Sequence, residues 1–130
     1  MIVADTSAWI DFLRGIESRV SRQLEELIEA EEDLAVTEIV VMELLGGATT
    51  GRADLRTNLL AYPILPLQGL QDYEEAALIF HRCRRAGETL RRGYVDCLIA
   101  VPALRAGAEV LHNDADFEVI ARHTDLKLVV

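Results

Sequence analysis

The sequence has few cysteines and no long apolar run, and these two absences exclude several classes of protein. Its 130 residues include only Cys83 and Cys97, too few for a disulfide framework and too irregularly placed for a zinc site. We expect both to be free, buried thiols. No apolar run approaches the roughly 20 residues that span a bilayer, and the first residues lack the pattern of a signal peptide. We therefore expect a cytoplasmic protein without a membrane segment.

Positive charge is also scarce, since the net charge is −9. This balance argues against nonspecific binding to nucleic acid, which depends on a cationic surface. The sequence contains no glycine-rich phosphate loop of either common type, so nucleotide-driven phosphoryl transfer is disfavoured. An acidic run over residues 25–33 is typical of a solvated helix face. The one plausible phosphate-contacting patch consists of arginines: Arg82, Arg84, Arg85, Arg91 and Arg92.

What the sequence does have is the composition of one ordinary globular domain over residues 1–130, with 51% hydrophobic and 27% charged residues. Short apolar segments alternate with helical patterns along the chain. We predict strands at 1–4, 33–36, 64–65 (an edge strand), 109–111 and 126–130, and helices at 7–13, 16–32, 38–47, 51–61, 70–86, 94–107 and 114–122. This alternation predicts an α/β fold with a parallel sheet and helices on both faces. Ligands of such sheets bind beyond the carboxyl ends of the strands.

Five acidic residues lie either at the carboxyl ends of predicted strands, where ligands bind, or within apolar helical stretches that we expect to be buried. Asp96 lies in the apolar stretch YVDCLIAV, and an ionised carboxylate is almost never fully buried unless it is paired or holds a metal. Asp5 ends the first strand, and Asp114 and Asp116 follow the fourth. Glu43 lies on an apolar helical stripe. We expect these five acids to converge on one crevice.

Each acid also has a purely structural interpretation. Asp5, and either Asp114 or Asp116, are good N-caps for the helices that follow them. Asp96 is near the start of its helix, and Glu43 can turn outward into solvent. Five unrelated coincidences at one end of one sheet are nevertheless less plausible than a shared site.

Convergent carboxylates raise one another's pKa and need a cation to stay ionised. Because the ligands are oxygens and no Cys/His constellation exists, Mg²⁺ or Mn²⁺ is favoured over zinc. A carboxylate-held divalent ion can activate water and neutralise a leaving oxygen, so the implied chemistry is hydrolysis of a phosphodiester or phosphomonoester.

Four motifs, in this order, resemble the PIN-domain ribonucleases and, within them, the VapC toxins of bacterial toxin–antitoxin pairs: DTSAWIDFLRG, MELLGG, VDCLIA and HNDADF. The resemblance covers essentially the whole chain. It implies a three-layer α/β/α sandwich around a parallel sheet and endonucleolytic cleavage of RNA that depends on Mg²⁺ or Mn²⁺. It also implies inhibition by a small VapB-type antitoxin, a homodimer, and a structured RNA substrate such as transfer RNA, read at an exposed loop.

By the same resemblance, the catalytic and metal-binding acids are Asp5, Glu43, Asp96, Asp114 and Asp116. Asp5 and Asp96 are the surest metal ligands, and Asp114 fits direct ligation better than Asp116. Thr6 matches a hydroxyl residue that can hold a ligand carboxylate or a water.

Two departures from the family pattern bear on the site. His112 stands where many relatives have Thr or Ser; it either contacts phosphate or, as we favour, is a partly buried histidine with satisfied partners. Pro102 lies inside the predicted helix that carries Asp96 and removes its backbone bond to Leu98. We expect a kink or a new helix there.

Arg91 and Arg92 are our candidates for contacting RNA or, alternatively, an antitoxin. If they contact RNA, neutralising them should weaken cleavage and lower its sensitivity to salt. Two other functions remain open at this stage. One is a catalytically idle PIN-like domain that acts through a protein partner. The other, a metal-dependent phosphatase, is disfavoured because the first strand is followed by Asp5, Thr6 and Ser7 rather than by D-x-D.

Overall fold

A five-stranded parallel sheet forms the centre of the molecule in the computed structural model, which describes all 130 residues. The strands are β1 (Ile2–Ala4), β2 (Leu34–Thr37), β3 (Ile64–Leu65), β4 (Glu109–Leu111) and β5 (Lys127–Leu128). Their order is β3-β2-β1-β4-β5, and every neighbouring pair is parallel. The predicted parallel sheet is confirmed, and β3 is an edge strand as expected.

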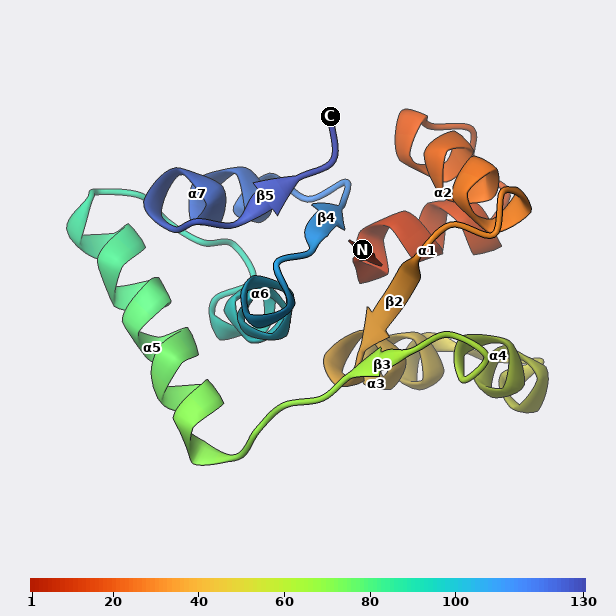
Figure 1. The fold of residues 1–130 in the computed structure, drawn as a ribbon, viewed down its shortest axis with the longest axis horizontal. Helices are drawn as coiled ribbons and strands as arrows, with labels where there is room; N and C mark the ends of the chain where they lie inside the picture. The colour runs from red at the N-terminus through yellow and green to blue at the C-terminus, as the bar shows by residue number, and fades with distance from the viewer.

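Seven helices flank this sheet: α1 (Thr6–Leu13), α2 (Arg19–Glu29), α3 (Glu38–Gly47), α4 (Arg52–Leu59), α5 (Leu70–Arg85), α6 (Tyr94–Ala106) and α7 (Ala115–His123). In Figure 1, α5 lies to the left of the strands, α6 below β5 and β4, and α1 and α2 to the right of β4. The predicted α/β/α architecture is therefore confirmed. None of the helices is both long enough and apolar enough to cross a membrane.

The central strands are buried on both faces, as is usual for a parallel sheet covered by helices. Val3 and Ala4 of β1, Val36 of β2 and Val110 of β4 are fully buried. Both cysteines are free and buried, as predicted. The residues just before the carboxyl ends of β1 and β4 are therefore packed in the apolar core. This packing holds the backbone from which the side chains at that edge project.

Helix α2 is shorter than its apolar periodicity suggested, since it starts at Arg19 rather than near residue 16. Ser18 is its N-cap: the Ser18 hydroxyl accepts from the backbone N–H of Ser21 at 3.1 Å, and the Ser21 hydroxyl accepts from that of Ser18 at 3.0 Å. This reciprocal capping fixes the helix start. Strand β5 is also shorter than the predicted 126–130.

Helix α6 runs without interruption from Tyr94 to Ala106 and includes Pro102. The alternative in which a new helix starts at Pro102 is wrong. Pro102 removes only the helical bond to Leu98. Burial of neighbouring side chains such as Ile99, Val101 and Ala103 offsets that loss. Because the affected turn lies after Asp96, the first turn of α6 and its carboxylate are left intact.

Candidate metal centre

The site lies at the carboxyl edge of two adjacent strands. Ala4 at the end of β1 is in register with Leu111 at the end of β4. The backbone N–H of Asp5 donates to the Leu111 carbonyl at 2.9 Å. The chain passes from β1 to β2 on one side of β1, and from β3 it crosses to β4 on the other side. The edge between β1 and β4 is therefore the topological switch point where open α/β sheets bind ligands.

Asp5 uses only one of its two carboxylate oxygens as a helix cap. Oδ2 accepts hydrogen bonds from the backbone N–H and the hydroxyl of Ser7, at 3.1 and 2.7 Å. Oδ1 is buried and has no hydrogen-bond partner. Burial raises the pKa of Asp5, against the opposing effect of the Ser7 and Thr6 hydrogen bonds and of the Arg92 charge. The cap interpretation and the ligand interpretation are therefore compatible, because each accounts for a different oxygen.

Asp96, in the first turn of α6, has the least satisfied carboxyl group in the site. Its side chain is 0% exposed, and neither oxygen accepts a hydrogen bond from a donor group. Burial, a hydrogen bond with Asp114 and the charges of Asp5 and Asp114 raise the pKa of Asp96 to about 9, although Arg92 opposes the shift. Two carboxyl groups can share a hydrogen bond only when one of them is protonated. Without a further cation, burial and the neighbouring acids therefore favour the protonated form of Asp96.

Asp114 is the N-cap of α7, where its Oδ1 accepts from the backbone N–H of Asp116 at 3.0 Å. Asp96, Asp114 and Asp116 each place one carboxylate oxygen within 4.8 Å of the others. The prediction that one member of the D-x-D pair caps the last helix is confirmed for Asp114, which also faces the acidic cluster.

Asp116 has a different set of contacts from the other acids. Its Oδ1 accepts from the backbone N–H of Arg91 at 2.9 Å, and its Oδ2 from that of Arg92 at 2.8 Å. Asp116 thereby ties the turn before α6 to the start of α7. Both oxygens already have a donor, in contrast to the free oxygens of Asp5 and Asp96, so direct metal ligation by Asp116 stays a prediction.

Glu43 extends from α3 toward the same cluster and is fixed by Thr6. The Thr6 hydroxyl donates to Oε1 of Glu43 at 2.8 Å. Thr6 is buried, and the Glu43 side chain is 21% exposed. Glu43 thus points into the site rather than outward. Of the two roles foreseen for Thr6, the geometry favours holding a ligand carboxylate.

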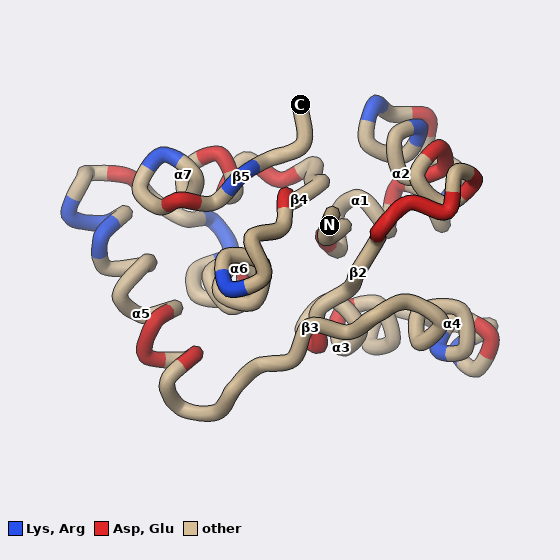
Figure 2. Tube along the Cα trace, in the orientation of Figure 1, with Lys and Arg blue, Asp and Glu red and all other residues tan.

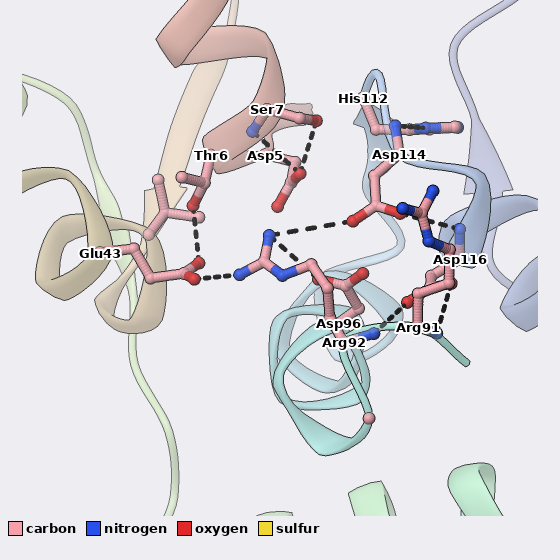
Figure 3. Close-up of polar contacts among 12 residues, drawn as sticks. Asp5, Thr6, Ser7, Glu43, Arg91, Arg92, Asp96, His112, Asp114 and Asp116 are labelled. Carbon is pink, nitrogen blue, oxygen red and sulfur yellow. Dashed lines mark hydrogen bonds and ion pairs between the residues drawn. The ribbon is translucent and has the colours of Figure 1, made fainter. Parts of the chain in front are cut away.

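Arg92 lies among these acids (Figure 3). Its guanidinium forms an ion pair with Glu43, and its Nη1 is 3.7 Å from Oδ1 of Asp96 and 3.8 Å from Oδ2 of Asp114. Burial disfavours the charged guanidinium, but the charges of Asp96 and Glu43, and then those of Asp5 and Asp114, outweigh burial and raise its pKa.

Sequence reasoning grouped Arg92 with Arg91 as candidates for contacting RNA or an antitoxin and missed the position of Arg92 among the acids. The available signal was the spacing of four residues between Arg92, in the turn before α6, and Asp96, in its first turn. Arg91 is exposed, and its side chain forms no ion pair.

His112 has partners for both ring nitrogens. Nδ1 accepts from the backbone N–H of Asp114 at 3.1 Å, and Nε2 lies 3.4 Å from Oε1 of Glu118. Its ring packs on Phe117 with centroids 5.3 Å apart. These contacts agree with the favoured interpretation of a partly buried, satisfied histidine.

The remaining arginines of the predicted patch lie at the C-terminal end of α5, and Figure 2 shows them far from the acidic residues around α2. Arg82 donates to the carbonyl of His123 at 2.9 Å, and Arg84 lies over the Phe80 ring. Arg92 is the one arginine of the patch that contacts the acidic cluster.

The donor set fits a hard divalent cation. All candidate ligands are carboxylate oxygens, and three of those oxygens, one on Asp5 and two on Asp96, are buried without a donor. An unsatisfied buried polar atom costs about 1–3 kcal/mol, and more when it is charged. Mg²⁺ and Mn²⁺ prefer such oxygen ligands, whereas zinc prefers sulfur and nitrogen.

Comparison with known proteins agrees with this geometry. The family described as PIN domain matches residues 2–123. Ribonuclease VapC11 of Mycobacterium tuberculosis and VapC ribonuclease Mb1587 of Mycobacterium bovis are each 40% identical over 130 residues, covering 98% of this chain and 96% of the relative. The chain therefore belongs to the PIN-domain family and, within it, to the VapC ribonucleases.

Solved structures show the same fold at lower identity. VapBC2 from Rickettsia felis, bound to a DNA fragment from its promoter, has a TM-score of 0.74 at 20% identity and covers 99% of this chain and 98% of that one. FitAB bound to a DNA fragment has a TM-score of 0.72 at 22% identity, covering 99% and 94%. FitAcB from Neisseria gonorrhoeae has a TM-score of 0.67 at 24% identity, covering 100% and 97%.

Proposed function

We propose that this protein is an endoribonuclease that requires Mg²⁺, with Mn²⁺ as a substitute, and that acts in the cytoplasm as the toxin of a type II toxin–antitoxin system. The observation that carries the proposal is the set of buried carboxylate oxygens on Asp5 and Asp96 that have no hydrogen-bond donor. In a catalytically idle domain we would expect these buried carboxylates to have hydrogen-bond donors, because buried structural carboxylates normally do.

The roles of the side chains follow from their contacts. Asp5, Asp96 and Asp114 would hold the ion, with Glu43 beside them and Asp116 supporting from the α7 side. When bound, the ion supplies water activation and charge neutralisation at the scissile phosphate. The Ser7 bonds fix the orientation of Asp5, and the Thr6 bond fixes that of Glu43.

Glu43 is the most exposed of the five acids, with Asp114 next at 13%. It is therefore the acid best placed to accept a proton from a water that enters from solvent.

The substrate we propose is RNA, with structured RNA such as transfer RNA as the leading candidate. The partner is a VapB-type antitoxin, and the toxin acts as a homodimer. The relatives support the RNA substrate and the antitoxin partner: two are named ribonucleases, and the Rickettsia felis neighbour is a VapBC assembly. Sequencing RNA ends after induced expression, with and without the adjacent antitoxin gene, would identify the target and test the inhibition.

The direct test is cleavage of labelled RNA by purified protein with Mg²⁺, with Mn²⁺ and with a chelator. We expect the chelator to abolish cleavage and Asp96→Asn to lower its rate by roughly 10²–10³-fold, because the ion that would neutralise charge at the scissile phosphate loses a ligand. Asp72→Asn is the matched control, since Asp72 is a buried aspartate on α5 outside the site. Equal rates for Asp96→Asn and wild type in Mn²⁺ would remove the proposal.

A further inference from the structure

A cation of the protein itself occupies the centre of the acidic cluster. The Arg92 guanidinium pairs with Glu43 and lies within 4 Å of Asp96 and Asp114, three of the acids that the proposed function assigns to the metal centre. We propose that Arg92 is an internal counter-ion that a divalent cation must displace, so that metal uptake is an exchange of one cation for another. This inference rests on the proposed metal centre.

Coexistence of the two cations in the cluster is unfavourable for two reasons. The guanidinium uses the same carboxylate groups that the ion would use, on three different elements: α3, α6 and the N-cap of α7. Moreover, like charges a few ångströms apart in a partly desolvated site repel strongly. A divalent ion that binds these carboxylates therefore has to break the Arg92 contacts.

The structure allows the Arg92 side chain to leave without disturbing its backbone. The N–H groups of Arg91 and Arg92 are both held by Asp116, which anchors the turn before α6. The Arg92 side chain is 31% exposed, so it borders solvent and can rotate outward. Figure 3 shows the side chain reaching across from the start of α6 toward Glu43, with Asp5 and Asp114 above it. The fixed backbone and the partly exposed side chain are what an exchangeable counter-ion requires.

The alternative is that Arg92 is a permanent structural ion pair. In that case, removing it would leave the acids without their cation and would not help a metal to bind. The two interpretations therefore predict different metal affinities for a variant without Arg92, and the affinity can be measured without RNA.

The first experiment measures Mn²⁺ binding to wild type, Arg92→Gln, Arg92→Lys and Arg91→Gln by electron paramagnetic resonance at fixed pH and ionic strength. We expect Arg92→Gln to bind Mn²⁺ at least about tenfold more tightly than wild type, because no cation has to leave, which corresponds to about 1.4 kcal/mol. Arg92→Lys should fall between the two. Arg91→Gln changes the net charge equally, but the Arg91 side chain forms no ion pair with the acids, so this variant should stay within about twofold of wild type. Equal or weaker binding by Arg92→Gln would overturn the proposal.

The second experiment uses the wild-type protein and so does not depend on the folding of a variant. Arginine Nε–H signals are followed by NMR during titration with Mg²⁺, with the Arg92 signal assigned by its disappearance in Arg92→Lys. We expect this signal to shift with the same midpoint as Mg²⁺ binding. Mg²⁺ binding with an unmoved Arg92 signal would overturn the exchange. Because neither experiment uses RNA, failure of the exchange is distinguishable from failure of the ribonuclease proposal, which is decided by the cleavage assay.

Discussion

Asp72 and Asp96 are both buried aspartates paired with an arginine, but they differ in the number of hydrogen-bond donors that reach their oxygens. Asp72, in the first turn of α5, forms an ion pair with Arg105 from the last turn of α6, and its Oδ2 accepts from the backbone N–H of Gln68 at 2.7 Å. Asp96, at the other end of α6, has a longer contact of 3.7 Å to Arg92 and accepts no hydrogen bond from a donor.

The pKa values move in opposite directions as a result. Burial raises the pKa of Asp72, but hydrogen bonds from Arg105 and Gln68 and the Arg105 charge outweigh burial and hold it below its usual value. At Asp96, burial is reinforced by the neighbouring acids, and the pKa rises to about 9. Burial of a carboxylate therefore does not by itself indicate function. The number of donors that reach its oxygens separates an aspartate that joins two helices from one that awaits a ligand.

Substituting each aspartate by asparagine should change the free energy of unfolding with opposite signs. We expect Asp72→Asn to lower it by about 1–3 kcal/mol, since the Arg105 pair and a charged acceptor are lost. Asp96→Asn should raise it by a similar amount without metal, because asparagine has no proton to take up on folding, whereas the raised pKa of Asp96 makes that uptake costly at this pH. Urea denaturation of metal-free protein at pH 7.5 measures both. Destabilisation by both substitutions would show that Asp96 is as well satisfied as Asp72.

The same pair should differ in the pH dependence of stability. The folded-state pKa of Asp96 is raised, so its contribution is fully present below about pH 4, where both states are protonated, and is lost as the pH rises toward about 9. Metal-free wild type should therefore lose stability relative to Asp96→Asn over this window, by at most about 1.4 kcal/mol per pH unit.

For Asp72 the pH dependence of stability has the opposite sign, because the folded-state pKa of Asp72 is lowered. The stability that Asp72 contributes should be present above about pH 4 and lost as the pH falls further. Denaturation curves of the three proteins from pH 3 to pH 9 check both slopes. If the difference in unfolding free energy between wild type and Asp96→Asn stayed constant across the range, the raised pKa of Asp96 would be contradicted. Saturating Mg²⁺ should abolish the loss of wild-type stability with rising pH.

The smallest effect concerns the two neighbouring arginines, Arg91 and Arg92, which the structure separates into an exposed one and one within the acidic cluster. If Arg91 contacts an RNA phosphate, Arg91→Gln should reduce the slope of log affinity against log salt by about 1. Binding of RNA to a cleavage-deficient Asp96→Asn background, measured between low and moderate salt, tests this. An unchanged slope would mean that Arg91 does not contact the RNA backbone.

Much of the fold could be predicted because its signals are local. Short apolar runs, capping residues such as Thr37 and the bracketing prolines of β3 are read within a few positions of one another. The predicted helix ends were less accurate. Apolar periodicity did not show that Ser18 caps α2, so that the helix starts at Arg19 rather than near residue 16. Of the two effects expected of Pro102, a new helix is wrong, because whether a helix continues through proline depends on the packing around it.

The acidic cluster could be foreseen because parallel strands bring their carboxyl ends to one edge. Asp5 and Asp114 were therefore expected at the same edge of the sheet, and the observed strand order makes them neighbours. The way in which each carboxylate is used could not be foreseen. Asp116 binds two backbone N–H groups, and Asp5 divides its oxygens between a cap and a free position. Such contacts join residues distant in the chain or depend on side-chain orientation.

The sequence by itself determined the order of strands and helices, the acids at the strand ends and the family, because these depend on residue type and short-range spacing. Only the tertiary structure decided which oxygens lack donors and that Arg92 lies among the acids instead of on the surface. The physical reason is that hydrogen-bond satisfaction and electrostatic pairing are properties of positions in space, and α3, α6 and α7 meet at this site only after the chain has folded.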